Sequence, residues 1–302
     1  MSARVPVRID GRDLSVSNLD KVLYPETATT KAAVIDYYTR IADVMLPHLA
    51  QRPVTMVRFP DGVDGDSFFE KRCPSHRPEW MQTVQLGREG REKVVDHCHL
   101  QERADLVWAA NLAALELHTP MARAPGTEVP LAVVFDLDPG PPADVVTCAQ
   151  VAMLLKSVLD QLGLQGWPKT SGSKGLQVYV PLNQPDMDYD RTRSFALSVG
   201  SLLEKVHPEL VLTKMDKSER TGKVFVDWSQ NHLVKTTVCV YSMRARTRPT
   251  VSTPLAWDEV SDGADGTREL VFEIADVLAR VESGGDRFAP ILTLEQDLPS
   301  LG

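Results

Sequence analysis

One segment of the chain, AVVFDLDPGPP at positions 132–142, constrains the fold more than any other. Its apolar run over 133–137 is rich in residues that favour strands, and the Asp-Pro-Gly-Pro-Pro sequence that follows cannot continue a strand. The sequence therefore predicts a buried strand that stops at this turn, with two acidic residues at its end.

The segments around this strand alternate between the two secondary-structure periods. Apolar residues recur at the helical spacing after Thr30, which can cap a helix, and Asp10-Gly11 stands between two alternating runs, as in a hairpin. We expect helices over 31–46, 106–118, 144–162 and 189–206, strands over 53–60, 67–71, 176–180 and 223–227, and a hairpin over 5–16. Because helices and strands alternate, we predict an α/β or α+β fold.

Length and composition are those of a folded protein. The 302 residues are 43% hydrophobic and 25% charged, which excludes disordered and fibrous classes. A chain of this length can bury a sizeable core as one large domain or as two lobes. It has no internal repeat and no low-complexity linker, so we expect one catalytic unit with an acidic segment attached after Pro249.

Targeting signals and cysteine usage indicate the compartment. The apolar stretch over 106–117 is interrupted by Asn111 and Glu116 and is shorter than the ~20 residues that cross a bilayer. Residues 1–13 carry charges throughout and lack the apolar run of a signal peptide. The four cysteines are spaced irregularly, unlike a secreted disulfide framework, so we expect reduced thiols. We predict a cytoplasmic protein with no membrane partner.

The net charge of −8 argues against a nucleic-acid partner until its distribution is considered. Residues 251–302 hold 11 acids and three bases, so the first 250 residues are neutral overall. Between positions 213 and 248, eight Lys and Arg residues stand with only three acids, which makes a local cationic stretch. Such a stretch is either a solvated loop or a surface for phosphate groups.

Three acids at predicted strand ends form a candidate metal site. Asp136 and Asp138 are two residues apart, so their side chains project from one face of the strand, with Cα atoms roughly 6.5 Å apart. Asp227 ends a second predicted strand and would complete the site if the two strands are neighbours. Carboxylates bind Mg²⁺ or Mn²⁺, and a pair of ions can hold the attacking and leaving oxygens of an in-line displacement. Taken alone, a D-x-D pair is more often simply polar residues at a strand exit.

A glycine- and serine-rich loop, TSGSKG at 170–175, strengthens the metal-site interpretation. Its backbone N–H groups, its hydroxyls and the Lys174 ammonium can hold the phosphates of a nucleotide. The spacing does not match G-x-x-x-x-G-K-[ST], which disfavours a P-loop ATPase. Acid pair, loop and third acid together indicate a metal-dependent phosphoryl or nucleotidyl transferase.

A weaker candidate is a structural zinc site. Cys73 and His76 lie upstream of the sequence His97-Cys98-His99, and these residue types are zinc ligands. Because H-C-H places alternate side chains on opposite faces of a strand, at most two of the three can point at one ion. The alternative is that Cys73 and Cys98 are small buried apolar residues.

A series of motifs gives the chain a resemblance to a known family. In order they are NLDKVLYP, TTKAAVIDYY, FFEKRCP, LAALELHTP, VVFDLDPG, TSGSKGLQVY, GKVFVDWSQN and YSMRARTRPTV. They resemble the polymerase domain of bacterial DNA ligase D from non-homologous end joining, in the archaeo-eukaryotic primase superfamily. The resemblance implies one primase-polymerase domain over 1–302, matched to about residue 250, with two packed sheets flanked by helices. Residues 251–302 would be an acidic extension packed on that domain.

The resemblance also implies roles for individual residues. It assigns Asp136, Asp138 and Asp227 to two catalytic Mn²⁺ or Mg²⁺ ions. It assigns Lys21 and Lys31 to a pocket for a DNA 5′-phosphate, and Arg220 to a loop that brings two DNA ends together. The residues around the incoming nucleoside triphosphate would be Phe68, Phe69, His118, Ser171, Ser173, Lys174, Gln230 and Arg244. The two phenylalanines would stack on bases, the alternative being ordinary core positions.

The chain departs from the family motif at Gln177, where S-G-x-K-G-x-H has histidine. Glutamine can donate a hydrogen bond but cannot carry positive charge or shuttle a proton. Catalysis would then be slower, or Lys174 and His118 would compensate. The departure keeps a second interpretation open, a non-catalytic module that binds and aligns 5′-phosphorylated DNA ends, and a metal-dependent nuclease is a third.

We therefore predict a nucleotidyltransferase that extends primer 3′-ends at gaps and double-strand breaks and prefers ribonucleotides. Its partners would be gapped, 3′-overhanging or broken DNA, nucleoside triphosphates, Ku and a separate DNA ligase. The start methionine and the acidic tail favour a stand-alone protein of the bacterial nucleoid.

Overall fold

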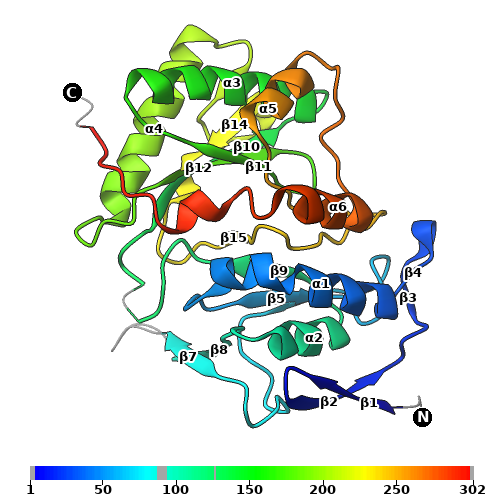
Figure 1. The fold of residues 1–302 in the computed structure, drawn as a ribbon. Helices are drawn as coiled ribbons and strands as arrows, with labels where there is room; N and C mark the ends of the chain where they lie inside the picture. The colour runs from blue at the N-terminus through cyan, green and yellow to red at the C-terminus, as the bar shows by residue number, and fades with distance from the viewer. Residues whose placement is uncertain (1–3, 87–93, 126, 300–302) are drawn as a thin grey trace. The chain divides into compact units, whose positions relative to one another are not determined.

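The computed structural model describes residues 4–86, 94–125 and 127–299 (Figure 1). The chain divides into two compact units, each assembled from three separate segments. Unit 1 consists of Met1–Pro125, Val238–Val251 and Glu273–Gly285, and unit 2 consists of Gly126–Thr237, Ser252–Phe272 and Asp286–Gly302. Helices and strands are mixed in both units, so the predicted α/β or α+β class is confirmed.

Unit 2 is built on a five-stranded sheet with the strand order β11-β12-β10-β14-β13. The strands are β10 (Ala132–Pro139), β11 (Trp167–Thr170), β12 (Leu176–Pro181), β13 (Val211–Leu212) and β14 (Val224–Asp227). Neighbours run antiparallel except β13 and β14, which are parallel. The predicted buried strand is therefore the central strand of this sheet, β10, and its first six residues are all buried.

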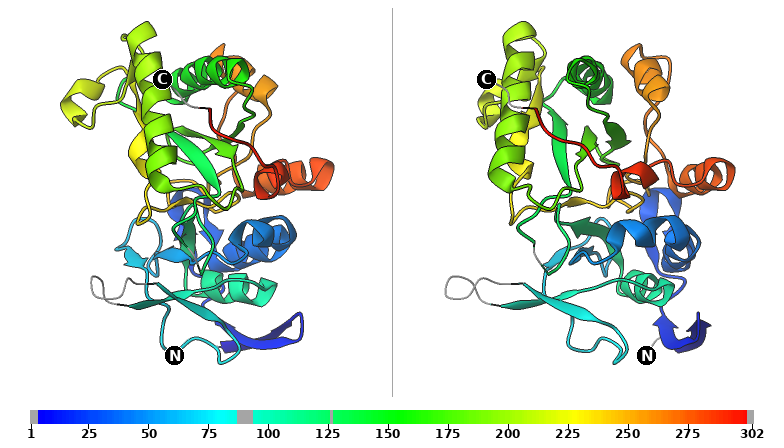
Figure 2. Two further views of the ribbon diagram at one scale, coloured as in Figure 1. Left: turned by 90° about the vertical axis from the view of Figure 1, so that its left-hand side faces the viewer. Right: turned by 60° about the vertical axis from the view of Figure 1, so that its left-hand side comes forward.

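Two helices cover one face of this sheet and lie beside each other (Figure 2). They are α3 (Val145–Gln161) and α4 (Tyr189–Val206), capped by the side chains of Asp144 and Asp188. The ring of Phe135 on β10 packs edge-on against Phe195 of α4, with 6.3 Å between the ring centroids. Because side chains alternate along a strand, the residues on either side of Phe135 project from the opposite face of the sheet.

Unit 1 contains a four-stranded sheet with the order β15-β9-β5-β6 and three helices. The strands are β5 (Thr55–Arg58), β6 (Phe68–Glu70), β9 (Ala114–Thr119) and β15 (Thr237–Val238), and the helices are α1 (Lys31–Leu49), α2 (Arg103–Asn111) and α6 (Ile274–Gly284). Helix α1 begins where predicted, because the Thr30 hydroxyl accepts a hydrogen bond from the Ala33 N–H at 3.3 Å. It packs against both α2 and α6.

The predicted helix over 106–118 is wrong in its second half. Helix α2 ends at Asn111, Ala113 turns the chain with a left-handed φ of 56°, and β9 follows. Strand β9 pairs with β5, placing His118 opposite Thr55 and Leu117 opposite Met56. Alanine, leucine and glutamate favour helices, but the gain from completing a buried sheet outweighs that local preference.

The remaining elements are short. In the described part of the chain, three two-stranded sheets pair β1 (Arg4–Ile9) with β2 (Arg12–Ser17), β3 (Val22–Tyr24) with β4 (Thr29–Thr30), and β7 (Thr83–Leu86) with β8 (Val95–Cys98). The same residues include four single turns of 3₁₀ helix, η1 (Pro25–Thr27), η2 (Lys217–Arg220), η3 (Trp228–Gln230) and η4 (Ala289–Leu292). The predicted hairpin over 5–16 is confirmed, with both residues of its Asp10-Gly11 turn at positive φ.

The acidic C-terminal segment contributes to both units. Helix α5 (Trp257–Ala264) belongs to unit 2, where it packs on α3, and α6 belongs to unit 1. Among the described residues, no helix is long and apolar enough to span a membrane.

Candidate functional site

Four side chains form a row across the sheet of unit 2, one from each of four neighbouring strands. Lys169 on β11 lies opposite Gln177 on β12, Gln177 lies opposite Asp136 on β10, and Asp136 lies opposite Asp227 on β14. Directly opposed residues of antiparallel strands have Cβ atoms about 4.5–5.5 Å apart. The row projects from the face of the sheet opposite to α3 and α4. The strands that carry Asp136 and Asp227 are neighbours, which was the condition for Asp227 to join the acid pair.

The acids of this row repel one another. Burial, the charge of Asp138 and the charge of Asp227 raise the pKa of Asp136 to about 7, although its hydrogen bond from Gln177 lowers it. The Asp227 carboxylate accepts hydrogen bonds from the backbone N–H of Ser229 at 3.0 Å and from its hydroxyl at 2.5 Å. A raised pKa at a buried carboxylate indicates an excess of negative charge around it. A bound cation would balance that charge.

The donor atoms of these three acids are of the chemical type that hard divalent cations bind. Asp136, Asp138 and Asp227 offer only oxygen ligands, which Mg²⁺ and Mn²⁺ prefer, and a cation would satisfy the charge that now raises the Asp136 pKa. Within residues 4–86, 94–125 and 127–299, no three His, Cys, Asp or Glu side chains converge closely enough to hold a metal ion. The positions shown would therefore need side-chain rotation to close a three-ligand site.

The glycine- and serine-rich loop lies against the same end of β10. A Cβ on Gly175 would collide with the carbonyl oxygen of Leu137, so only glycine permits this close approach. Within the loop, the Ser171 hydroxyl accepts hydrogen bonds from the N–H groups of Ser173 and Gly175, both at 3.2 Å. The Lys174 side chain is exposed. The structure therefore brings the predicted phosphate-binding loop and the acid pair to one edge of the sheet.

A second cluster of charged residues forms in unit 1 around Glu116, a buried acid on β9. Its Oε2 lies 2.9 Å from the His118 Nε2, and its Oε1 forms an ion pair with the Arg244 Nε at 3.0 Å and accepts a hydrogen bond from the Ala245 N–H. Burial would raise the pKa of Glu116, but the His118 hydrogen bond and the Arg244 charge lower it to about 2. The predicted nucleotide-binding residues His118 and Arg244 are thus brought together by an acid that sequence analysis treated only as an interruption of an apolar stretch.

A further cation lies beside this cluster. The Arg246 side chain is exposed, but partial desolvation and the charge of Arg244 lower its pKa. One carboxylate, Glu116, therefore stands with two guanidinium groups and a histidine. Such an excess of positive charge suits an anionic group.

The two predicted 5′-phosphate ligands also lie together in unit 1. The Lys31 backbone N–H donates to the Lys21 carbonyl oxygen at 2.8 Å, and the Lys31 ammonium donates to the Ser17 carbonyl oxygen at 2.7 Å. Burial and the neighbouring Lys21 charge lower the pKa of Lys31 to about 8. The Lys21 ammonium forms an ion pair with Asp61 at 2.7 Å. The two positive charges repel each other, and an anion bound between the two ammonium groups would reduce that repulsion.

Phe68 and Phe69 are not core residues. They lie on β6, the last strand of the four-stranded sheet, and are 55% and 59% exposed. The Lys71 ammonium lies 5.9 Å from the centroid of the Phe69 ring. Two adjacent exposed aromatic rings beside a cation are typical of a surface that stacks on bases.

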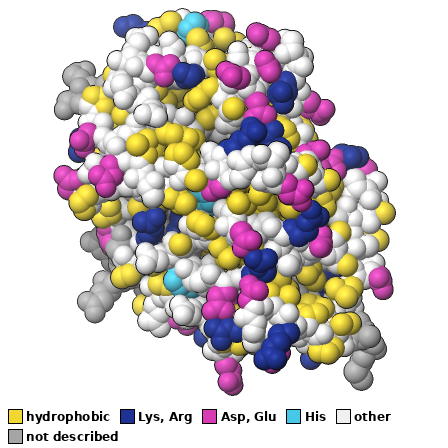
Figure 3. All heavy atoms as spheres, viewed as in Figure 1, with side chains coloured by type: hydrophobic (Ala, Val, Ile, Leu, Met, Phe, Trp, Pro, Cys, Tyr) yellow, Lys and Arg dark blue, Asp and Glu magenta, His cyan; other side chains and the backbone are white. Residues whose placement is uncertain are grey.

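Arg220 and Gln230 flank β14 in sequence. The Arg220 guanidinium lies over the Phe225 ring at 3.8 Å and donates to the Met215 carbonyl oxygen at 3.0 Å, so it is held by its own loop. Gln230 ends η3, directly after Asp227 and its Ser229 partner. On the face drawn in Figure 3, basic and acidic side chains intermingle.

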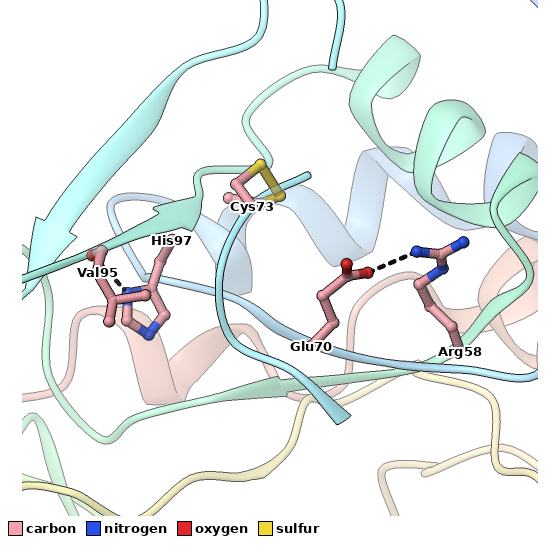
Figure 4. The surroundings of a disulfide bond; sticks show 6 residues. Arg58, Glu70, Cys73, Val95 and His97 are labelled. Carbon is pink, nitrogen blue, oxygen red and sulfur yellow. Dashed lines mark hydrogen bonds and ion pairs between the residues drawn. A yellow bond between two sulfur atoms is a disulfide. The ribbon is translucent and has the colours of Figure 1, made fainter. Parts of the chain in front are cut away.

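The zinc prediction and the prediction of reduced thiols are wrong for Cys73 and Cys98, which form a disulfide (Figure 4). The Cys73 N–H donates to the Asp96 carbonyl oxygen, which aligns the segment with β8 and places the two Cα atoms 4.7 Å apart. Sulfur atoms bonded to each other are not available as thiolate ligands. His97 instead contacts the Val95 carbonyl oxygen, at 3.2 Å. Cys148 and Cys239 are buried and keep their thiols, as predicted.

Comparison with known proteins decides the family. Residues 30–288 match the protein-family model described as "LigD, primase-polymerase domain". The chain belongs to the LigD primase-polymerase domain family. It is 42% identical over 286 residues to "Multifunctional non-homologous end joining protein LigD" of Mycolicibacterium smegmatis, covering 94% of this chain and 36% of the relative. It is 32% identical over 286 residues to "Bifunctional non-homologous end joining protein LigD" of Bacillus subtilis, covering 95% of this chain and 45% of the relative.

A solved structure supports the same assignment. The "Polymerase Domain from Mycobacterium tuberculosis Ligase D in complex with DNA" superposes with a TM-score of 0.85 at 40% identity, covering 92% of this chain and 98% of that one. The fold is therefore that of a LigD polymerase domain, which is a nucleotidyltransferase domain of non-homologous end-joining repair proteins. The chain spans less than half the length of the LigD relatives it matches.

Proposed function

We propose that this LigD primase-polymerase domain extends primer 3′-ends at gaps and double-strand breaks, with a preference for ribonucleotides. The observation that carries the proposal is the opposition of Asp136 and Asp227 on neighbouring strands, with Asp138 two residues along β10. Buried acids at strand ends beside a phosphate-binding loop suit the transfer of a nucleotidyl group. The ribonucleotide preference is part of the proposal because the resemblance to the family implies it.

Asp136, Asp138 and Asp227 would hold two divalent cations, Mn²⁺ or Mg²⁺. Bound there, such ions supply a lowered pKa for the primer 3′-hydroxyl and neutralise charge on the triphosphate. The loop at 170–175 would contact phosphate oxygens through its N–H groups, the Ser171 and Ser173 hydroxyls and the Lys174 ammonium. For His118, Gln230 and Arg244, the resemblance to the family implies contacts to the nucleotide as well.

In unit 1, the charge balance around Glu116 supports a role in holding the triphosphate. Glu116 fixes His118 and Arg244 in place, and Arg246 adds a positive charge that Glu116 does not neutralise. A guanidinium whose carboxylate partner fixes it is preorganised to bind a phosphate group in a single orientation.

We propose DNA as the partner, bound by contacts that do not read base sequence. Phe68 and Phe69 would stack on bases, at about 1–3 kcal/mol per base. Lys21 and Lys31 would bind a 5′-phosphate at the downstream side of a gap, and the loop that holds Arg220 would align two DNA ends. Because phosphate contacts release counterions, affinity for gapped DNA should fall steeply with salt. Ku and a DNA ligase are the proposed protein partners, in the bacterial nucleoid.

Primer extension on a short-gapped duplex with a 5′-phosphate tests the proposal. The reaction contains Mn²⁺ and each ribonucleoside or deoxyribonucleoside triphosphate in turn, beside the Asp136→Ala/Asp138→Ala variant. We expect templated products, more from ribonucleotides, that fall by ~10³-fold or more in the variant. The control is Asp160→Ala, since Asp160 is an exposed acid paired with Lys156 on α3.

DNA binding by the same proteins, measured by fluorescence anisotropy, separates the alternatives. The proposal predicts that the double variant binds gapped DNA within about threefold of the wild type, since metal ligands are not DNA anchors. Bound but unextended DNA with the wild-type protein would indicate a module that only aligns ends. Shortened primers would indicate a nuclease.

A further inference from the structure

Lys169 is a buried cation at the end of the row that contains the predicted metal ligands. Its side chain is only 1% exposed and belongs to β11, in unit 2. The ammonium donates to the Gln177 Oε1 at 2.6 Å and to the Ser252 hydroxyl at 2.7 Å, and it lies 5.5 Å from the centroid of the Tyr179 ring. A buried ammonium is costly unless hydrogen bonds hold it, so this environment is built for a cation.

The ammonium determines which way the Gln177 amide points. The two ends of a glutamine amide have nearly the same shape, so shape alone does not select an orientation. An ammonium has donors only, and therefore the amide oxygen must face Lys169. The NH₂ group then faces the acid on the next strand, and its Nε2 lies 3.1 Å from the Asp136 Oδ1.

The two hydrogen bonds act in series. Attraction of the amide oxygen by an ammonium draws electron density from the NH₂ group and makes it a stronger donor. Lys169, Gln177 and Asp136 lie directly opposite one another in the register of three neighbouring strands. We call the two hydrogen bonds that join Lys169 to Gln177 and Gln177 to Asp136 the relay. The positive charge of Lys169 on β11 thus strengthens the hydrogen bond that the neutral Gln177 donates to Asp136 on β10.

We propose that Lys169 is a positioning residue of the acid cluster, which acts through Gln177 to hold an amide NH₂ group on Asp136. Resting on the proposed polymerase function, this assigns to Lys169 the positive charge that a glutamine at position 177 lacks. If Lys169 were absent, the amide could turn its oxygen toward Asp136, where it would repel the carboxylate.

NMR of the metal-free protein tests the relay without any reaction. Selective ¹⁵N labelling of glutamine side chains gives NH₂ signals, and those of Gln177 are identified by their absence in Gln177→His. We expect the Gln177 NH₂ protons to exchange with solvent at least ~10-fold more slowly than those of exposed glutamines, and to lose that protection in Lys169→Met. Unchanged protection in Lys169→Met would overturn the proposal.

The controls separate charge, hydrogen bonding and folding. Lys156→Met makes the same substitution at a lysine whose ammonium also lies over a ring, Trp257 at 5.7 Å, and it should leave the Gln177 signals as they are. Lys169→Gln keeps a donor toward Gln177 but removes the charge, so it separates the hydrogen bond from the charge. If Lys169→Met does not fold, Lys169→Leu replaces it, with the same expected loss of protection. We expect Lys169→Gln to retain the protection of the NH₂ protons, because its amide can still donate to the Gln177 oxygen.

Primer extension tests the consequence for catalysis. We expect Lys169→Met to lower kcat by ~10–100-fold while KM for the nucleotide changes by less than about threefold. Lys169→Met/Gln177→His should recover to within about threefold of the wild type, because a histidine supplies its own donor and charge. Wild-type kcat in Lys169→Met, or a double variant no better than the single one, would overturn the proposal. Failure of the wild type to extend primers would instead refute the proposed function. The NMR exchange measurement would still test whether Lys169 orients the Gln177 amide.

Discussion

Two buried charge clusters of this protein are balanced in opposite ways. Around Glu116 in unit 1, one carboxylate holds a histidine and an arginine directly, and its pKa is lowered to about 2. Around Asp136 in unit 2, burial and two further carboxylates raise the pKa to about 7, and the cation of the row, Lys169, reaches Asp136 through Gln177. The acid of the first cluster is paired directly with basic groups and contributes to stability, whereas the acids of the second repel one another and cost stability.

Removing Glu116, the acid of the first cluster, should have the largest effect on folding. We expect Glu116→Gln to lower the free energy of unfolding by about 3 kcal/mol, because it leaves the largely buried Arg244 without its carboxylate. Urea unfolding followed by circular dichroism measures this. The control is Glu282→Gln, since Glu282 pairs with Arg40 at an exposed position and should cost less than about 0.5 kcal/mol. Equal effects of the two substitutions would contradict the comparison.

Acid should remove the same contribution from the wild type. A carboxyl group with a pKa of about 2 in the folded state and 4.5 in the unfolded state stabilises the fold above pH 4.5. That stabilisation, about 3 kcal/mol, is lost as the pH falls from 4.5 to 2. The stability difference between wild type and Glu116→Gln should therefore shrink over this range in urea titrations. A difference that stays constant with pH would mean that Glu116 acts through packing alone.

The opposite sign is expected in unit 2. In a metal-free buffer at pH 8, Asp136→Asn should raise the free energy of unfolding by about 1–2 kcal/mol, since it removes one of three repelling carboxylates. Thermal unfolding in the presence of EDTA measures this, with Asp160→Asn as the exposed control. Destabilisation by Asp136→Asn would show that the Asp136 carboxylate, like that of Glu116, is stabilised by the groups around it.

The smallest effect concerns a third charged pair, Lys21 and Lys31. The Lys31 ammonium carries the charge that would attract a 5′-phosphate, and its pKa of about 8 means that this charge is lost as the pH rises through 8. The preference for 5′-phosphorylated over 5′-hydroxyl gapped DNA should fall about two- to fivefold between pH 7 and pH 9. Competition binding by anisotropy measures it, and Lys31→Arg should keep the preference at pH 9. A preference that is equally strong at both pH values in the wild type would rule out Lys31 as the ligand.

Local patterns in the sequence were sufficient for much of unit 2. Helix α4 has the predicted bounds, and β14 ends at the predicted Asp227, because caps and turn residues lie next to these segments. The sequence alone left open whether the strands of Asp136 and Asp227 were neighbours, and the register places them opposite each other. The roles of these acids as metal ligands stay predictions.

What sequence analysis missed depends on contacts between distant segments. Glu116 is matched with Arg244, more than a hundred residues away, and the ammonium of Lys169 is held in part by Ser252. Lys169 stands directly before the glycine- and serine-rich loop, yet no local pattern signals a buried lysine. The disulfide between Cys73 and Cys98 likewise depends on a tertiary alignment that spacing does not disclose.

The interleaved course of the chain has a consequence for its synthesis. Because each unit contains three separate segments, the polypeptide passes from one unit to the other five times between residues 125 and 286. Unit 1 receives α6 only after residue 273, and unit 2 receives its last segment only after residue 286. Neither unit can therefore be completed on the ribosome until its last segment has emerged, and until then the nascent chain would expose unfinished apolar surface to chaperones.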